Sequence, residues 1–548
     1  MLGRTDARVK RTSVALGLVL ALVLAVPAAG QGSTATADVP PVAPDFATRS
    51  SGKHLSVADL PAPRRFVTQH KAEIGGKPLS YTATAEETYI TSIAGEPVGR
   101  FFTFSYVKNG PVDRDRPVLF VFNGGPGSAS LWLHMGALGP KRAYLDRGVN
   151  PSNVPPFGLV ENGSSPLDVT DMVFIDPIGT GFSHAVGEAQ DADFAGVDAD
   201  VDSVARFIEA WLGRNGRFHS PKFVLGESYG GYRAAVLPRA LMGGLAYGGV
   251  MRGITLDGVI IVGSPLSAGA SQPTTPARGI DRTVGDLIPG MAITARYHKR
   301  VPTDAKSTEA LYEEVARFVR TDYAEALQRL KAGILPEPAQ AAIAARLAGY
   351  TGVPAETWIR NKLQINPPQY GAMALADEGL DIGLYDSRYT LPLKNRGVDF
   401  VADDPAMTQY VPGMIAAFHE MLKDQLKVEM PIPYEAIVWE GVFSRWNHRR
   451  AGVTPTQTYA GDLAVAMRRQ PRMRAMLVSG YYDLLATPLA MRNAVEQAGV
   501  PMDRVALRTF ESGHMSYLGN TIKQFGDSVR RFVVETMQRA DTAASSHD

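Results

Sequence analysis

The sequence predicts an α/β protein with a mostly parallel sheet flanked by helices. Short apolar runs bounded by turn residues recur along the chain, and amphipathic stretches such as Val201–Leu212 and Ala486–Ala498 separate several of them. Runs that are apolar at nearly every position suit strands buried on both faces, as in parallel sheets covered by helices. The expected strands are Pro117–Phe122, Met172–Ile175, Phe223–Leu225, Val259–Val262, Ala475–Val478 and Val505–Phe510.

This alternation is interrupted in the second half of the chain. Helical periodicity occurs at Leu311, Val315, Phe318 and Val319 and again around Ala339–Leu347, with few convincing strands nearby. We therefore predict a largely helical insertion that covers the active edge of the sheet. The expected organisation is a signal peptide and polar lead over 1–37, an N-terminal extension over 38–80, a first part of the α/β domain over 81–270, the insertion over 271–431 and the second part of the domain over 432–548.

Composition narrows the class of protein. The chain has 548 residues, of which 45% are hydrophobic, and this is enough to bury a substantial core. Its formal net charge of +1 gives no field that would recruit nucleic acid or an anionic membrane. The absence of cysteine excludes disulfides, thiolate metal sites and a cysteine nucleophile. Covalent catalysis would need another nucleophile, and nothing in the composition predicts an oligomeric state.

The N-terminus is predicted to be a secretory signal peptide. Four basic residues between Arg4 and Arg11 precede an apolar run from Val14 to Val26, and small residues follow at 27–30. This order is typical of a signal peptide, and the apolar run is short for a membrane span. An uncleaved anchor helix is the alternative interpretation. We expect a secreted or periplasmic protein with no stable membrane insertion after signal cleavage.

A candidate nucleophile follows one of the predicted strands. Lys222-Phe-Val-Leu leads into Gly226-Glu-Ser-Tyr-Gly, and a helical run comes next. The flanking glycines permit a tight strand-to-helix turn that pushes the hydroxyl of Ser228 out of the sheet at a helix N-terminus. The bare pattern is common in proteins, but the strand before it and the helix after it favour a nucleophile.

A glycine-rich loop follows an earlier strand. Val118–Phe122 runs into Asn123-Gly-Gly-Pro-Gly. Such a loop can bring bare backbone N–H groups close to a developing oxyanion, where side chains would obstruct them. The alternative interpretation is an ordinary turn at the end of a strand. A phosphate-binding loop is excluded because no Gly-Lys-Ser/Thr follows.

A base and an acid come later in the chain, acid first, as in hydrolases with this strand-turn-helix serine. Most of the ten histidines lie in polar termini, before the serine or in the insertion, and His448 is interpreted as part of a polar surface or cap segment. His514 and Asp483 each follow a predicted strand, where open α/β sheets place their chemistry. We predict Ser228 as nucleophile, His514 as general base and Asp483 as the residue that orients the base, with Asp462 as the alternative acid.

Four ordered motifs together resemble the serine carboxypeptidases. They are Asn123-Gly-Gly-Pro-Gly, Gly226-Glu-Ser-Tyr-Gly-Gly, Gly480-Tyr-Tyr-Asp and Gly513-His-Met, and Asp176-Pro-Ile-Gly-Thr-Gly-Phe-Ser is similar to that family's loop between the first two. The resemblance runs from about Tyr81 to Val533, apart from the insertion. It implies an α/β-hydrolase fold with a helical cap, removal of single amino acids from peptides with a free C-terminal carboxylate, and no metal or organic cofactor.

The same resemblance implies roles for residues around the nucleophile. The backbone N–H groups of Gly125 and Tyr229 would form an oxyanion hole. Asn123, Gly124 and Glu227 would bind the terminal carboxylate of the substrate.

The chain departs from the family pattern at several positions. Ala137 stands where a second acidic residue is common, and Val121 where tryptophan is common. Ala137 bears on carboxylate binding, because a second acid could share a proton with Glu227. The alternative functions are an esterase or acyltransferase on the same scaffold, a proline aminopeptidase, which also has a Gly-Gly-Pro-Gly loop, and a catalytically silent binding protein. Glu227 beside the nucleophile argues against the esterase or acyltransferase and against the proline aminopeptidase, and the ordered serine, acid and base argue against the binding protein.

Overall fold

The structure is a computed structural model, and it describes residues 55–545 apart from 112, 146–147, 150–154, 245–246, 248, 268–284, 303, 398 and 455–456. The chain divides into two units, residues 1–40 and 41–548, and every described residue belongs to the second. The predicted signal peptide therefore lies outside the described residues. Within the part that is described, no helix combines the length and the apolar character needed to span a bilayer.

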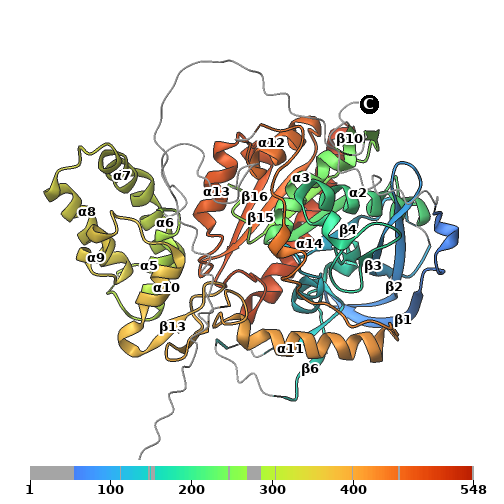
Figure 1. The fold of residues 1–548 in the computed structure, drawn as a ribbon, viewed down its shortest axis with the longest axis horizontal. Helices are drawn as coiled ribbons and strands as arrows, with labels where there is room; N and C mark the ends of the chain where they lie inside the picture. Colours follow the sequence, from blue (N-terminus) through green and yellow to red (C-terminus); the bar gives the residue numbers. More distant parts are fainter. Residues whose placement is uncertain are drawn as a thin grey trace, which may run out of the picture. The chain divides into compact units, whose positions relative to one another are not determined.

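A ten-stranded mixed sheet organises the second unit (Figure 1). Its strand order is β1-β2-β3-β7-β4-β9-β12-β15-β16, with β8 (His184–Ala185) paired to β3. All neighbouring strands from β7 to β16 run parallel. These strands are β7 (Asp171–Ile175), β4 (Val118–Phe122), β9 (Lys222–Glu227), β12 (Gly258–Val262), β15 (Arg474–Gly480) and β16 (Val505–Phe510). They correspond to the six apolar runs, so the predicted parallel sheet is confirmed.

Side chains of the buried strands alternate between two hydrophobic cores. In β4, Leu119 and Val121 enter one core, whereas Val118, Phe120 and Phe122 enter the other. Helices α11 (Met407–Glu420) and α14 (Ile522–Ser545) pack into the first core, and α2 (Val197–Arg214), α3 (Tyr229–Met242), α12 (Tyr459–Arg469) and α13 (Pro488–Gln497) into the second. A mostly parallel sheet covered by helices in this way is the α/β-hydrolase fold that the motifs implied.

Three long antiparallel strands at one side of the sheet escape a search for continuous apolar runs. They are β1 (Arg65–Ile74), β2 (Lys77–Thr91) and β3 (Pro97–Lys108), and β1 lies inside the segment expected to be an N-terminal extension. Along β1, exposed residues alternate with partly buried ones. Antiparallel strands with one solvated face show this alternation. Such a strand contains no continuous apolar run, so a search for such runs does not find it.

The described residues between β12 and β15 are mainly helical, which confirms the predicted cap (Figure 1, yellow to orange). The helices before α11 are α5 (Ile288–Tyr297), α6 (Thr308–Phe318), α7 (Ala324–Lys331), α8 (Glu337–Thr351), α9 (Ala355–Arg360) and α10 (Pro367–Ala374). A short hairpin, β13 (Leu380–Ile382) and β14 (Thr390–Pro392), separates α10 from α11. The cap has its own core around Trp358 and Tyr370, and Tyr482 and Leu484 from the loop after β15 pack into that core.

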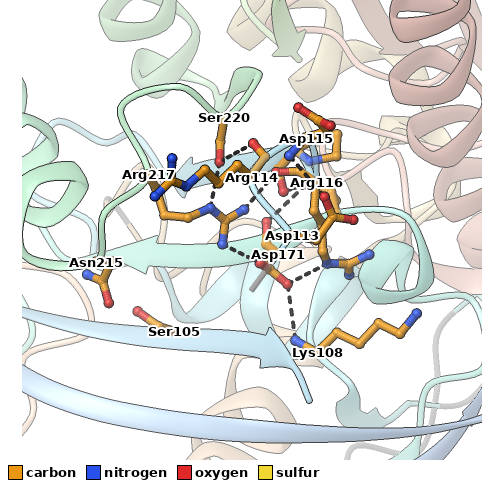
Figure 2. Close-up of polar contacts among 12 residues, drawn as sticks. Ser105, Lys108, Asp113, Arg114, Asp115, Arg116, Asp171, Asn215, Arg217 and Ser220 are labelled. Atoms are coloured by element: carbon orange, nitrogen blue, oxygen red, sulfur yellow. Dashed lines mark hydrogen bonds and ion pairs between the residues drawn. The ribbon is translucent and has the colours of Figure 1, made fainter. Parts of the chain in front are cut away.

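The amino-terminal ends of the parallel strands are closed by buried ion pairs (Figure 2). Asp171, the first residue of β7, accepts hydrogen bonds from Arg116 Nε at 2.8 Å, Arg217 Nη1 at 2.7 Å and the backbone N–H of Lys108 at 3.1 Å. Arg217 also donates to the carbonyl of Arg116 at 2.7 Å. Val118, the first residue of β4, pairs with Asp171 in the sheet, so the ion-pair network holds the amino-terminal ends of β4 and β7 together. The candidate site lies at the opposite, carboxyl-terminal edge of the sheet.

Substitution Asp171→Asn should therefore destabilise the protein without altering the site. It leaves the buried guanidinium of Arg217 and the partly buried guanidinium of Arg116 without their anion. Removing one partner of a buried pair costs about 3–5 kcal/mol. Urea unfolding followed by circular dichroism measures the change. Asp322→Asn, which breaks an exposed pair with Arg346, is the matched control and should leave the midpoint in place. Equal midpoints for the two variants would contradict the importance of the Asp171 network.

Candidate active site

Ser228 occupies the turn between β9 and α3, at the carboxyl edge of the sheet. Its backbone has φ 59° and ψ −126°, a conformation that costs a residue with a side chain about 1–3 kcal/mol. The N–H of Ser228 donates to Val262 O at 2.8 Å, and its carbonyl accepts from Gly231 N at 2.8 Å. A Cβ on Gly226 would overlap the carbonyl of Gly230. The glycines on both sides of the serine are thus required for the turn.

The glycine-rich loop after β4 lies directly against the start of α3. A Cβ on Gly124 would overlap the backbone nitrogen of Tyr229 and lie 2.6 Å from the carbonyl oxygen of Glu227. The next residue, Gly125, has φ +96°, which favours glycine. The N–H groups of Gly125 and Tyr229 donate to no acceptor among the described residues. Two backbone donors beside the serine are therefore available to an anion.

His514 and Asp483 form a buried pair beyond the ends of β16 and β15. His514 Nδ1 lies 2.8 Å from Asp483 Oδ2, and Asp483 Oδ1 accepts the backbone N–H groups of Leu485 at 2.7 Å and Ala486 at 2.9 Å. This arrangement fixes a proton on Nδ1 and leaves the lone pair on Nε2. The buried Nε2 has no partner among the described residues. Such a base often forms its bond to the nucleophile only when substrate binds.

Glu227, immediately before the serine, is a second buried carboxyl group. Its Oε2 accepts hydrogen bonds from Asn123 Nδ2 at 3.0 Å and from the hydroxyl of Tyr517 at 2.7 Å. Asn123 is held in turn, because its Oδ1 accepts from Leu133 N at 3.0 Å and its carbonyl accepts from Arg233 Nη1 at 2.7 Å. Glu227 is thus oriented by side chains that are themselves fixed.

Burial and charge set the protonation of Glu227 and His514. Burial raises the pKa of Glu227 to about 7, although the charge of His514 and the hydrogen bonds from Tyr517 and Asn123 oppose the rise. For His514, burial lowers the pKa, but the charge and hydrogen bond of Asp483 outweigh it, and the pKa lies above its ordinary value. Glu227 is therefore a neutral acid below about pH 7 and a carboxylate above it.

These groups meet in one cavity of about 800 Å³. Its floor contains Ser228, His514 and Glu227, together with Asn123, Gly124, Gly125 and Tyr229. Much of the remaining wall is apolar. Cap residues and residues of the segment that follows the cap contribute to it, among them Tyr385, Phe400, Val401, Met407, Ile437, Trp439, Phe443, Trp446 and His448. Seven of the eight residues predicted to form the site thus line one cavity, and the eighth, Asp483, contacts His514.

Part of the chain resembles known proteins. Residues 82–280 match the family model described as "Serine carboxypeptidase". The resemblance predicted from the motifs is confirmed. The matched region contains the glycine-rich loop and the turn at Ser228, while Asp483 and His514 lie beyond it.

Individual relatives match a limited part of the chain. Serine carboxypeptidase-like 36 of Arabidopsis thaliana is 26% identical over 31% of this chain and 33% of its own length, and serine carboxypeptidase-like 8 of the same plant is 30% identical over 27% and 32%. The match thus spans about a third of these relatives. A prohormone-processing carboxypeptidase from Saccharomyces cerevisiae has a TM-score of 0.47 at 15% identity, covering 83% of this chain and 92% of that one. A proline iminopeptidase from Mycobacterium smegmatis has a TM-score of 0.36 at 15% identity, covering 83% and 99%.

Two interpretations of individual residues are changed by the structure. His448 was expected in a polar surface or cap segment, but its side chain lines the cavity, and burial lowers its pKa. Asp462, the alternative acid, is fully buried in ion pairs with Arg239 and Arg450 and does not line the cavity. The pair with Arg239 joins residues more than two hundred positions apart, whereas Arg450 lies only twelve positions before Asp462.

Two residues near the site were not predicted at all. Tyr517 donates to Glu227, and Tyr385 of the cap places its ring edge-on to His514, with centroids 5.1 Å apart, while its carbonyl accepts the N–H of His514 at 2.6 Å. The position of Tyr517 three residues after His514 was the only available signal.

Among the described residues, no cluster of histidine and carboxylate side chains is arranged to hold a metal ion.

Substitution Gly124→Ala should lower kcat/KM on the order of 10²-fold, because the added methyl must displace either the loop or the start of α3, and a displacement of about 1 Å has this effect. Steady-state kinetics on an activated ester measures it. Gly349→Ala is the matched control, since a Cβ there meets nothing within 4 Å on the exposed side of α8. It should keep full activity. Full activity of Gly124→Ala would contradict the close contact as a requirement of the site.

Proposed function

We propose that this protein is an exported serine carboxypeptidase that hydrolyses the C-terminal peptide bond through an acyl-enzyme on Ser228. The supporting observation is that one cavity is lined by Ser228, the buried acid Glu227 and His514, whose Nδ1 lies 2.8 Å from Asp483 Oδ2. The first three suit acyl transfer. Glu227 adds a group that can donate a hydrogen bond to a carboxylate when it is protonated. A site for acyl transfer with a carboxylate receptor beside it suits a carboxypeptidase.

The chemical steps follow from the roles of the side chains. As Ser228 Oγ attacks the carbonyl carbon, His514 Nε2 takes the hydroxyl proton, and the N–H groups of Gly125 and Tyr229 bind the oxyanion. The C–N bond then breaks, and His514 returns the proton to the departing amine. Water next attacks the acyl-enzyme with His514 again as base, which releases the shortened peptide and restores Ser228. Asp483 holds the imidazole in the required tautomer throughout.

The substrate class follows from the walls of the cavity. The terminal carboxylate would lie at Glu227, Asn123 and Gly124. The side chains of the substrate would then face the apolar and aromatic wall, which includes Trp439 and Phe443. Burial of apolar side chains there is favourable by roughly 25 cal/mol per Å² of surface removed from water. We therefore propose peptides with apolar residues next to the scissile bond.

Export rests on the N-terminal sequence alone. Basic residues, an apolar run over Val14–Val26 and small residues follow one another in the order of a signal peptide. We propose a secreted or periplasmic location on this basis.

An esterase or acyltransferase is the second candidate function. It would use the same nucleophile, base and oxyanion donors, and the apolar wall would suit an uncharged acyl group. Glu227 discriminates between the two, because only a substrate with a terminal carboxylate needs its proton.

The nucleophile is tested by covalent labelling. An organophosphonate probe should modify Ser228 stoichiometrically, and Ser228→Ala should abolish both labelling and turnover, leaving at most about 10³-fold catalysis over water from the oxyanion donors and binding. Intact-mass and peptide mass spectrometry locate the adduct. Ser128 provides the control, because it is a second serine that lines the cavity. Its hydroxyl oxygen accepts a hydrogen bond from Trp132 Nε1 at 2.8 Å. Ser128→Ala should still be labelled, and an adduct at any residue other than Ser228 would refute the assignment.

The carboxylate receptor is tested by pH dependence. Activity on a peptide acid needs neutral His514 and protonated Glu227, so kcat/KM should rise as His514 loses its proton and fall as Glu227 ionises near its pKa of about 7. The corresponding C-terminal amide should show the rise without the fall, because it brings no negative charge toward Glu227. Glu227→Gln keeps a donor that cannot ionise, and it should extend peptide-acid activity to higher pH.

The decisive comparison is kcat/KM from pH 5 to 9 for one peptide acid and its amide, in wild type and Glu227→Gln. A wild-type preference for the amide at every pH, with no effect of Glu227→Gln, would exclude a carboxypeptidase and favour the esterase or acyltransferase.

A further inference from the structure

The two oxygens of Glu227 have different surroundings. Oε2 accepts two hydrogen bonds, from Asn123 Nδ2 at 3.0 Å and from Tyr517 Oη at 2.7 Å. Both hydrogen bonds of the Glu227 side chain to described residues thus end on Oε2 and none on Oε1, and Glu227 lines the cavity. In a neutral carboxylic acid the carbonyl oxygen is the better acceptor, and the hydroxyl oxygen carries the proton. Two donors at Oε2 therefore favour the tautomer with the proton on Oε1.

Tyr517 is held rigidly for this contact. Its side chain is 1% exposed, and its ring packs edge-on against Phe525, with centroids 5.4 Å apart. The other side of the ring lies against the turn η2 (His134–Leu138), where a Cβ on Gly136 would come within 2.5 Å of the tyrosine ring. The neighbouring Ala137 is fully buried in that turn and has no side-chain donor. The hydroxyl of Tyr517 thus supplies a polar contact to Glu227 that the turn itself cannot supply.

We infer that Tyr517 is a positioning residue that holds Oε2 of Glu227, so that the protonated acid presents its proton on Oε1 to the terminal carboxylate of a bound peptide. The inference rests on the proposed carboxypeptidase function. In this inference a tyrosine hydroxyl gives Glu227 the hydrogen bond that a second carboxylic acid would otherwise give. The two groups differ in their effect on the ionisation of Glu227. A phenol hydroxyl donates at all pH values below its own ionisation and never adds a negative charge beside Glu227 in that range.

The hydroxyl of Tyr517 should also set the upper pH limit of peptide-acid binding. A donor to the carboxylate favours the ionised form, so removing it should keep Glu227 protonated to higher pH. Other titratable groups act on Glu227 or on Tyr517 and remain in place when only the hydroxyl is removed. They are His514, Asp483, Tyr385 and Tyr410.

The test measures binding rather than turnover. In a Ser228→Ala background, titration calorimetry from pH 5 to 9 gives the Kd of an N-blocked dipeptide acid with an aromatic C-terminal residue. The affinity should fall above the pKa of Glu227. With Tyr517→Phe added, the pH at which the affinity falls should rise by about one unit. On the alkaline side this corresponds to about tenfold tighter binding. Below the fall the variant should bind equally or a few-fold more weakly, because Oε2 is less well held.

A second substitution moves the limit in the opposite direction. Replacing Tyr517 by 3-fluorotyrosine keeps the ring and strengthens the hydroxyl as a donor, so the fall in affinity should begin at lower pH. This variant tests the inference even where Tyr517→Phe does not fold. Tyr370→Phe is the matched control, because it also loses one buried hydroxyl, donated to Met291 O at 2.8 Å in the cap core. It should leave the pH dependence unchanged.

The outcomes separate this inference from the proposed function. If the dipeptide acid binds no better than its amide at any pH, the carboxypeptidase proposal fails. If the acid is preferred but Tyr517→Phe and 3-fluorotyrosine leave the fall in place, only the role of Tyr517 is overturned. In a Glu227→Gln background, Tyr517→Phe should shift nothing. A shift that persists there would assign the titration to His514 and would also overturn the inference.

Discussion

The strained turn at Ser228 is the constraint on which the rest of the candidate site depends. A positive φ at a residue with a side chain persists only where the surrounding structure holds it in place. Here the serine is held between the end of β9 and the first residue of α3. A Cβ on Gly231 would lie 2.5 Å from Ser264 Cβ, so α3 begins almost in contact with the end of β12. This close approach brings the first N–H groups of α3 to the same edge as the loop at Gly124.

The turn also places two carboxyl groups with different surroundings around one imidazole. Asp483 accepts two backbone N–H groups and lies 2.8 Å from His514 Nδ1. Glu227 accepts only neutral side-chain donors and is removed from water, so burial raises its pKa to about 7. Two acids with such different surroundings can serve different purposes in one site.

The elements that could be predicted from sequence are those with local signals. Buried parallel strands are apolar on both faces, and the turn at Ser228 requires glycines at fixed spacing, so both were recognisable. β1 and β2 were not, because exposed residues alternate along β1 and buried polar residues such as Glu86 and Glu87 interrupt the apolar positions of β2. The contacts of Tyr517 with Glu227 and of Tyr385 with His514 join residues that the fold alone brings together across 290 and 129 positions. No local pattern in the sequence indicates such a contact, and the same holds for the ion pair of Asp462 with Arg239.

The cap is connected to the candidate base as well as to the cavity wall. Asp404 Oδ2 accepts the N–H of Leu384 at 2.6 Å, and the next residue, Tyr385, contacts His514 through both its carbonyl and its ring. A Cβ on Gly513 would lie 2.4 Å from Asp386 Cβ, which leaves no space between the cap and the loop that carries the base. A change in the cap that reshapes the apolar wall near Phe400 would therefore also move His514. The same cap residues therefore contact both the cavity wall and the loop that carries His514.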